Sequence, residues 1–69
     1  MRIKVNGVEK SIQNANKEYS LLETLSQLGY KSNNIIVELN NTIVTNESWH
    51  ENNVKDGDKL EIVSIVGGG

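Results

Sequence analysis

Three consecutive glycines, Gly67, Gly68 and Gly69, close the sequence and are its most distinctive candidates for chemistry. Glycine has no side chain to pack and loses much conformational entropy on ordering, so this run adds nothing to a core. Only a glycine backbone is slim enough to enter a confined active site, and a terminal glycine leaves its carboxyl carbon unhindered for nucleophilic attack. We therefore expect residues 67–69 to be a flexible tail that delivers the Gly69 carboxylate into a partner's active site.

Other side chains that could do chemistry are scarce, because the 69 residues include no cysteine and one histidine. Without cysteine the chain cannot form a disulfide, a thiolate zinc site or an iron–sulfur cluster. We interpret His50 as a surface residue and its neighbour Trp49 as a cover for the end of the core. Asp56 and Asp58 flank a glycine, but the neighbouring sequence lacks the further oxygen ligands that a metal needs. The sequence thus predicts neither a metal site nor a stand-alone enzyme.

The charge balance excludes further functions. Seven Lys and Arg against nine Asp and Glu give a net charge of −2, and the basic residues form no run. Binding to nucleic acid needs clustered cations, so we do not expect it. No segment is apolar for long enough to span a bilayer, and residues 1–5 alternate apolar with basic side chains, unlike a signal peptide. We expect a soluble, cytoplasmic protein, monomeric when free, with no membrane contact and no bound cofactor.

The tail must be positioned by a folded domain, and the start of the sequence predicts a β-hairpin as its first element. Apolar and basic residues alternate over 1–5, Asn6-Gly7 is a strong two-residue turn signal, and residues 8–12 continue a second strand. Val8 and Ile12 are expected on the core face of that strand.

A short helix is predicted next. Ser20 and Glu23 have the spacing of a capping box, and Gly29 suits the left-handed position that ends a helix. A helix of about two and a half turns, at 3.6 residues per turn, is unstable alone and must pack on a sheet. Its apolar stripe is expected to consist of four leucines: Leu21, Leu22, Leu25 and Leu28.

The second half of the chain predicts three more strands. Residues 35–39 form the first, with Ile35, Val37 and Leu39 on one face, and Asn40-Asn41 turns into a short strand at 42–44. A turn at 56–58 leads into the longest β-branched run, residues 59–66. The element order ββαβββ fits an α+β domain of the β-grasp type, spanning residues 1–66, with one helix across a mixed sheet and the first and last strands as neighbours.

The final predicted strand carries apolar residues on both faces. If Leu60 and Ile62 face the helix, Val63 and Ile65 face away from it. Ile36 points outward from its own strand and could join them. Either this is a docking patch for another protein, or it reflects a strand that simply favours valine and isoleucine.

The whole chain resembles the ubiquitin-like sulfur carriers, and among them most closely the sulfur carrier family of the thiamine pathway. The most specific part of the resemblance is Asp56-Gly57-Asp58, which leads into a β-branched strand and the terminal glycines. The weaker motifs are Ile3-Lys4-Val5-Asn6-Gly7, Ser20-Leu21-Leu22-Glu23 and Ile36-Val37-Glu38-Leu39-Asn40.

The resemblance implies a particular chemistry at Gly69. An adenylating partner would activate the Gly69 carboxylate with ATP, and sulfur from a cysteine-derived persulfide would replace AMP to give a thiocarboxylate. That group would pass its sulfur to thiazole synthase, with Gly67 and Gly68 as the flexible arm and Val63 and Ile65 helping to dock the partners. A chain without cysteine cannot carry sulfur as its own persulfide, which leaves the carboxyl terminus as the carrier site.

Two related functions stay open on the sequence. The small subunit of molybdopterin synthase has the same fold and a Gly-Gly end, but its members are often longer and often have proline before the glycines, and this chain has no proline. A ubiquitin-like modifier joined to lysines through its C terminus is the other alternative. Covalent conjugates in a cell extract would distinguish it from a carrier with a free thiocarboxylate.

Overall fold

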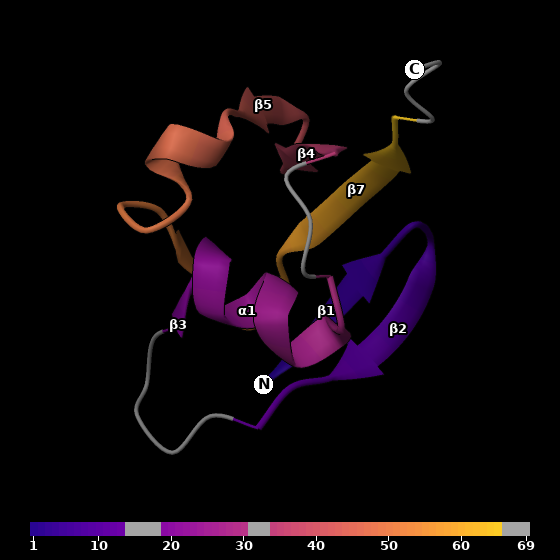
Figure 1. Cartoon of the computed structure of the whole chain (residues 1–69). Coiled ribbons are helices and arrows are strands. Elements are labelled where there is room, and N and C mark those ends of the chain that lie inside the picture. Colours follow the sequence, from indigo (N-terminus) through magenta and orange to yellow (C-terminus); the bar gives the residue numbers. More distant parts are fainter. Residues whose placement is uncertain (14–18, 31–33, 66–69) are drawn as a thin grey trace.

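The computed structural model describes residues 1–13, 19–30 and 34–65. Five strands form one mixed sheet in the order β2-β1-β7-β4-β5 (Figure 1). β1 runs parallel to β7, and the other neighbouring strands are antiparallel. The first and last strands are therefore neighbours, and the order of the main elements is the predicted ββαβββ. The bounds are β1 (Arg2–Val5), β2 (Val8–Ser11), α1 (Leu21–Leu28), β4 (Ile35–Leu39), β5 (Thr42–Val44) and β7 (Lys59–Ser64).

Three short elements were not predicted. β3 (Tyr19–Ser20) and β6 (Asn53–Val54) pair antiparallel in a small second sheet, and η1 (Asn46–Ser48) is a single 3₁₀ turn. Two-residue strands and a single 3₁₀ turn are too short to show a hydrophobic period, whereas the turn signal Asn40-Asn41 marks β5.

The predicted start and end of α1 are confirmed. The Ser20 hydroxyl accepts from the Glu23 N–H at 3.1 Å, and the Glu23 carboxylate accepts from the Ser20 N–H at 3.1 Å, which completes the capping box. Gly29 has a φ of 97°, the left-handed conformation that glycine adopts without steric cost. The eight-residue helix lies across one face of the sheet (Figure 1).

The predicted apolar stripe of α1 is wrong at Leu22, whose exposed fraction is 47%. The buried positions are instead Leu21, Thr24 and Leu25, and Leu28 is half-buried. These lie at i, i+3, i+4 and i+7, so they share one helical face, whereas Leu22 is rotated about 100° from Leu21 at 3.6 residues per turn. Thr24 is tolerated in the core because its hydroxyl donates to the Ser20 carbonyl oxygen at 3.0 Å.

Val8 lies on the predicted face of β2 but is not buried, since its side chain is 56% exposed. Val8 pairs with the buried Val5, so it does point to the core side of the sheet. However, β2 is an edge strand and Val8 lies at its hairpin end, which extends away from α1 (Figure 1). Ile12, just after β2, is buried as predicted.

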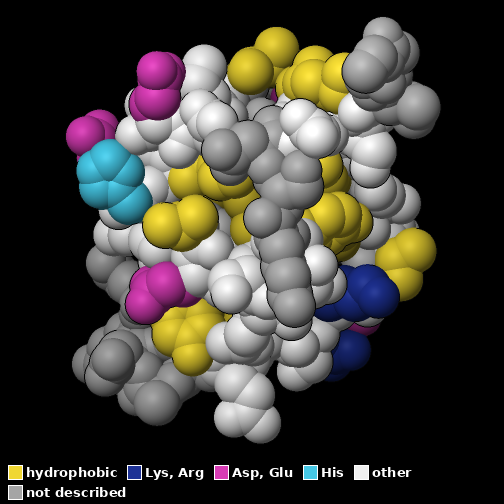
Figure 2. Space-filling model, in the orientation of Figure 1, with side chains coloured by type: hydrophobic (Ala, Val, Ile, Leu, Met, Phe, Trp, Pro, Cys, Tyr) yellow, Lys and Arg dark blue, Asp and Glu magenta, His cyan; other side chains and the backbone are white. Residues whose placement is uncertain are grey.

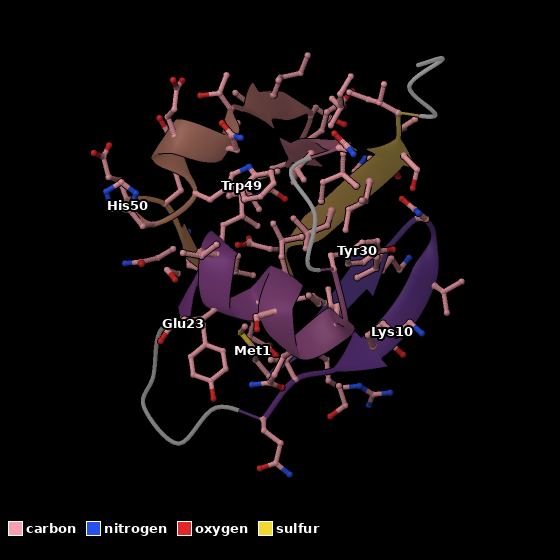
Figure 3. All side chains as sticks on the ribbon, in the orientation of Figure 1. Met1, Lys10, Glu23, Tyr30, Trp49 and His50 are labelled. Atoms are coloured by element: carbon pink, nitrogen blue, oxygen red, sulfur yellow. The ribbon has the colours of Figure 1, made fainter. Side chains whose placement is uncertain are left out.

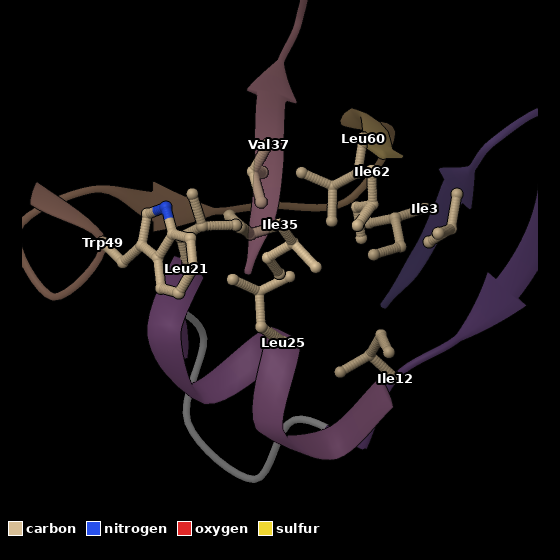
Figure 4. Packing of buried hydrophobic residues seen from close by; sticks show 11 residues of the cluster. Ile3, Ile12, Leu21, Leu25, Ile35, Val37, Trp49, Leu60 and Ile62 are labelled. Atoms are coloured by element: carbon tan, nitrogen blue, oxygen red, sulfur yellow. The ribbon is translucent and has the colours of Figure 1, made fainter. Parts of the chain in front are cut away.

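The core lies between α1 and the sheet, where Leu21 and Leu25 of the helix point toward the strands (Figure 4). Within the described ranges, no helix is long and apolar enough to cross a membrane. The buried hydrophobic cluster consists of Ile3, Val5, Ile12, Leu21, Leu25, Ile35, Val37, Trp49, Val54, Leu60 and Ile62.

Candidate functional site

β7 leads to the glycine tail and lies at the centre of the sheet. β4 pairs with it along its length, from Leu39 opposite Leu60 to Ile35 opposite Ser64. The Ile65 N–H extends this ladder by donating to the Asn34 carbonyl oxygen at 2.8 Å. The chain is therefore held by β4 up to the last described residue before the tail.

Asn6 secures β7 on its other side. β1 pairs with β7 only at Lys4–Lys59 and Val5–Leu60, because the chain turns at Asn6, whose φ is 52°. The Asn6 Oδ1 accepts from the Ile62 N–H at 2.7 Å, and Nδ2 donates to the Ile62 carbonyl oxygen at 3.1 Å. The Asn6 carboxamide thus takes the place of a peptide group on a neighbouring strand. It gives hydrogen-bond partners to the N–H and the carbonyl oxygen of Ile62. Sequence analysis identified Asn6 only as a turn residue, because a long-range side-chain contact leaves no local pattern.

The predicted register of β7 is confirmed. Leu60 and Ile62 are buried, whereas Val63 is 59% exposed. Ile36 lies directly opposite Val63 on β4 and is 43% exposed, and Ile65 is 48% exposed. The three residues predicted for partner docking are therefore at the surface, but their part in docking stays a prediction.

A fourth apolar residue, Ile43 on β5, was missed. It is 63% exposed and pairs with Glu38, so it lies on the sheet face that points away from α1. The alternation of Ile43 with Val44, whose side chain packs against the core, could have revealed it. Figure 2 shows hydrophobic side chains gathered at the top of the molecule, over β5 and beside the end of β7. We call Ile36, Ile43 and Val63 the apolar patch.

A surface recess adjoins this patch. It has a volume of about 250 Å³ and is lined by residues 35–37 of β4 and residues 43–46. β5 pairs with β4 only from Val37 to Leu39, so the recess lies where β4 extends beyond its neighbour. Ile36 and Ile43 line the recess and also belong to the apolar patch.

The outer face also carries charged side chains, among them the opposite-signed neighbours Lys4 and Glu9 on β1 and β2 and two like-signed pairs. Lys4 on β1 lies opposite Lys59 on β7, and Glu38 on β4 lies opposite Glu61 on β7. Both glutamates are half-buried. In the part of the chain that the structure describes, the ion pairs join Arg2 to Glu9 and His50 to Glu51, so neither glutamate is in one.

The two aspartates of the turn at 56–58 have structural roles. The Asp58 carboxylate is buried and accepts from the Lys55 N–H at 2.8 Å and from the Asn40 Nδ2 at 3.1 Å. Asp56 Oδ1 accepts from the Arg2 N–H at 2.7 Å. Among the described residues, no group of three or more His, Cys, Asp or Glu side chains could hold a metal ion.

The structural interpretations of Trp49 and His50 are also confirmed. Trp49 is 4% exposed, and its Nε1 donates to the Val44 carbonyl oxygen at 2.9 Å. His50 points outward at the periphery of the molecule (Figure 3), with a side chain that is 64% exposed. The predicted reactive residue Gly69 and the arm of Gly67 and Gly68 lie outside the described residues.

Comparison with known proteins identifies the family of this chain. Residues 3–69 match the model described as the ThiS family. The chain belongs to the ThiS family. It is therefore a ubiquitin-like sulfur carrier of the thiamine pathway, with the β-grasp fold that the sequence predicted.

Solved structures of ThiS-family proteins are similar over the whole chain. The crystal structure of the thiamine biosynthesis protein ThiS from Geobacter metallireducens has a TM-score of 0.83 and 31% sequence identity, and the match covers all of both chains. The solution structure of a thiamine biosynthesis protein from the same organism has a TM-score of 0.79 and 33% identity, covering all of this chain and 88% of that one.

Sequence relatives differ in how much of their length is matched. A thiazole synthase of Paramagnetospirillum magneticum is 39% identical over 69 residues, which are the whole of this chain and 20% of that protein. The uncharacterized protein ycf40 of Porphyra purpurea is 38% identical over 56 residues, 81% of this chain and 79% of that protein. This chain thus spans a fifth of the thiazole synthase but most of the ycf40 protein.

Proposed function

We propose that the Gly69 carboxylate is the group that carries sulfur. In the active site of an adenylating partner enzyme, this carboxylate attacks the α-phosphate of ATP. The reaction forms an acyl-adenylate and releases pyrophosphate. The terminal sulfur of a cysteine-derived persulfide then displaces AMP and forms an acyl disulfide with Gly69. A second thiol attacks the cysteine sulfur of that disulfide, which breaks the S–S bond, oxidises the two thiol sulfurs to a new disulfide and releases the thiocarboxylate on Gly69. ATP is a substrate of the partner and not a cofactor of this chain.

One observation carries this proposal: the match to the ThiS family extends through residue 69 and so includes the terminal glycines. The chain has no cysteine, so the side chains offer no thiol that could hold a persulfide. A carbonyl carbon next to a glycine is the least hindered acyl group that a protein can present to a nucleophile.

The remaining residues of the proposed site act by positioning. Gly67 and Gly68 form the narrow arm that reaches into the partner's active site, and Val63, Ile65 and Ile36 contact the surface around its entrance. Exposed apolar side chains next to a reactive group are typical of a protein interaction surface.

Thiazole synthase is the proposed acceptor of the sulfur. A segment similar to this whole chain makes up a fifth of the relative named thiazole synthase. Similarity to part of a protein of that name supports a functional association between a carrier of this type and thiazole formation.

A growth assay tests the proposed function. We expect the wild-type gene to restore growth of a carrier-deficient thiamine auxotroph without added thiazole, and deletion of Gly69 to abolish this, because the reactive carboxylate is displaced. The free energy of unfolding should be the same for both proteins, and Lys10→Ala, an exposed change on β2, should restore growth. Normal growth with the Gly69 deletion would contradict the proposal.

A further inference from the structure

Asn6 is the only asparagine of the sequence that a glycine follows. The chain has ten asparagines, and each of the others precedes a residue with a Cβ atom. Asparagine is a thermally labile residue, because the backbone nitrogen of the next residue can attack its carboxamide carbon. Glycine has no side chain to hinder that attack and allows the widest range of backbone conformations. Asn6-Gly7 is therefore the pair in this sequence best suited to spontaneous loss of the amide nitrogen.

The hairpin turn places both reacting groups at the surface. Val5 pairs with Val8, so Asn6 and Gly7 are the two central residues of the turn, with φ values of 52° and 82°. Both residues are exposed, so water reaches them. The hydrogen bonds found among the described residues do not include the Gly7 N–H. This nitrogen can therefore lose its proton to hydroxide without breaking a contact.

The Asn6 carboxamide, in contrast, is held at both of its ends. Its oxygen accepts from the Ile62 N–H at 2.7 Å, and its nitrogen donates to the Ile62 carbonyl oxygen at 3.1 Å. A reaction with Gly7 must bring the carboxamide carbon onto the Gly7 nitrogen, which cannot happen while both bonds hold the group against β7. The reaction thus proceeds only when the contact opens locally, and the two hydrogen bonds slow it.

We propose that Asn6 is a site of spontaneous deamidation that its contact with Ile62 restrains, and that its modification releases the N-terminal hairpin from β7. Hydroxide removes the proton of the Gly7 nitrogen, which attacks the Asn6 carboxamide carbon. The amide nitrogen takes up a proton from water and leaves as ammonia, and a five-membered succinimide closes. The inference concerns the fold and is independent of the proposed function.

Water then opens the succinimide at either of its two carbonyl carbons, and no atom is oxidised or reduced. Cleavage at the side-chain carbonyl gives an aspartate at position 6. Cleavage at the main-chain carbonyl gives an isoaspartate, in which the backbone runs through the former side chain of Asn6. Water and hydroxide are the only co-reactants, so the site needs no enzyme.

Neither product can restore the contact with Ile62. An aspartate keeps one oxygen for the Ile62 N–H, but its second oxygen replaces the donor that lies 3.1 Å from the Ile62 carbonyl oxygen. Two acceptors then face each other beside a residue that is 6% exposed, and an unpaired buried acceptor is costly. Isoaspartate adds one atom to the main chain of the two-residue turn and has no carboxamide, so it loses both bonds.

The loss affects the strand that leads to the tail. β1 pairs with β7 only as far as Val5 and Leu60. Beyond Leu60, the hydrogen bonds found among the described residues join the hairpin to β7 only through the Asn6 carboxamide. After modification, β7 is held beyond Leu60 by β4 alone.

Asp56-Gly57 offers a comparison site in the same chain, because an aspartate before glycine can close the same ring. The Gly57 N–H donates to the Arg2 carbonyl oxygen at 2.8 Å, and Asp56 Oδ1 accepts from the Arg2 N–H at 2.7 Å. The attacking nitrogen is bound here, and an ionised carboxylate is a poor electrophile. We therefore expect Asp56 to stay unmodified while the protein is folded.

Peptide mapping by mass spectrometry tests the proposal on the full-length protein. Samples are incubated at alkaline pH, either folded in buffer or unfolded in urea, and isoaspartate is measured by labelling with an isoaspartyl methyltransferase. We expect conversion of Asn6 in both samples, about tenfold or more slowly in the folded one, since two hydrogen bonds must open. Asn41 also has a positive φ of 71° but precedes Thr42, and it should stay unmodified in the folded sample.

The modified proteins test the effect on β7. Isoaspartyl protein, separated by chromatography, should unfold at a lower urea concentration than wild type. Asn6→Asp should show a smaller shift, because it keeps one of the two bonds. The Ile62 N–H should exchange with deuterium faster in the isoaspartyl protein and stay protected in Asn6→Asp.

Three results would overturn the inference. Equal rates in the folded and unfolded samples would show that Ile62 does not restrain Asn6. Conversion of Asn41 as fast as that of Asn6 would show that glycine does not determine the site. An isoaspartyl protein that unfolds at the wild-type urea concentration would show that the modification does not release the hairpin.

Discussion

Asn6 combines two roles that are usually separate. Its positive φ of 52° starts the β1–β2 turn, and its carboxamide makes two hydrogen bonds to the backbone of Ile62. Ile62 is only 6% exposed, so its N–H and carbonyl groups have little access to water. A single side chain thus links the N-terminal hairpin to the strand that leads to the tail.

We predict that Asn6→Gly lowers the free energy of unfolding by about 1–3 kcal/mol, the usual cost of leaving buried polar groups unsatisfied. Glycine keeps the left-handed conformation, so the loss reports the carboxamide and not backbone strain. Urea unfolding measures it. Asn41→Gly is the matched control, because Asn41 also has a positive φ of 71° and should change stability by less than about 0.5 kcal/mol. Equal effects of the two changes would contradict the role assigned to Asn6.

At the scale of elements, β7 presents different chemistry on its two faces. Leu60 and Ile62 pack under α1, while Glu61 and Val63 alternate with them on the outer face (Figure 4 shows the buried pair). A substitution on one face should therefore affect the core, and one on the other face should affect only contacts with a partner.

We predict that Val63→Asp changes the free energy of unfolding by less than about 1 kcal/mol but weakens binding to the adenylating enzyme by about tenfold or more. Ile62→Asp, one residue away, should destabilise the fold by about 3 kcal/mol or more, because it buries a charge without a partner. Thermal unfolding and titration of the same protein samples give both quantities. A Val63→Asp protein that unfolds like Ile62→Asp would contradict the register.

The periodic elements were predictable from the sequence because each has a local physical cause. The capping box of Ser20 and Glu23, the left-handed Gly29 and the alternation along β7 all follow from neighbouring residues. The exposure of Leu22 and Val8 was not predicted, because burial depends on where the helix axis lies over the sheet, and that is a tertiary property. The Asn6–Ile62 bonds and the Glu38–Glu61 pair join residues that are far apart in the chain, so no local pattern could predict them.

The candidate site was only partly predictable. The outward position of Val63 and Ile36 follows from strand alternation, and the structure confirms it. The outward position of Ile43 could have been inferred from the same alternation. The recess could not, because it depends on the length of β5 relative to β4, and β5 ends just before η1. The glycine tail was recognised from the position of three consecutive glycines at the end of the sequence, and its function is a proposal that rests on the family.

At the scale of the whole molecule, the two faces of the sheet differ in what they contact. α1 covers one face and forms a core there, so the outer face remains available to a partner (Figure 1). The strand at the centre of this sheet is also the strand that leads into the tail, so any force on the tail is opposed by two neighbouring strands, β1 and β4.

Intact-mass spectrometry tests the central claim most directly. The wild-type protein is incubated with ATP, a sulfur source and the adenylating enzyme, beside a sample without ATP and a sample of the Gly69 deletion. We predict that only the complete wild-type reaction gains the mass that corresponds to one carboxylate oxygen replaced by sulfur, and that fragmentation places this change on Gly69. No mass change in the complete reaction, or the same change in the Gly69 deletion, would contradict the account.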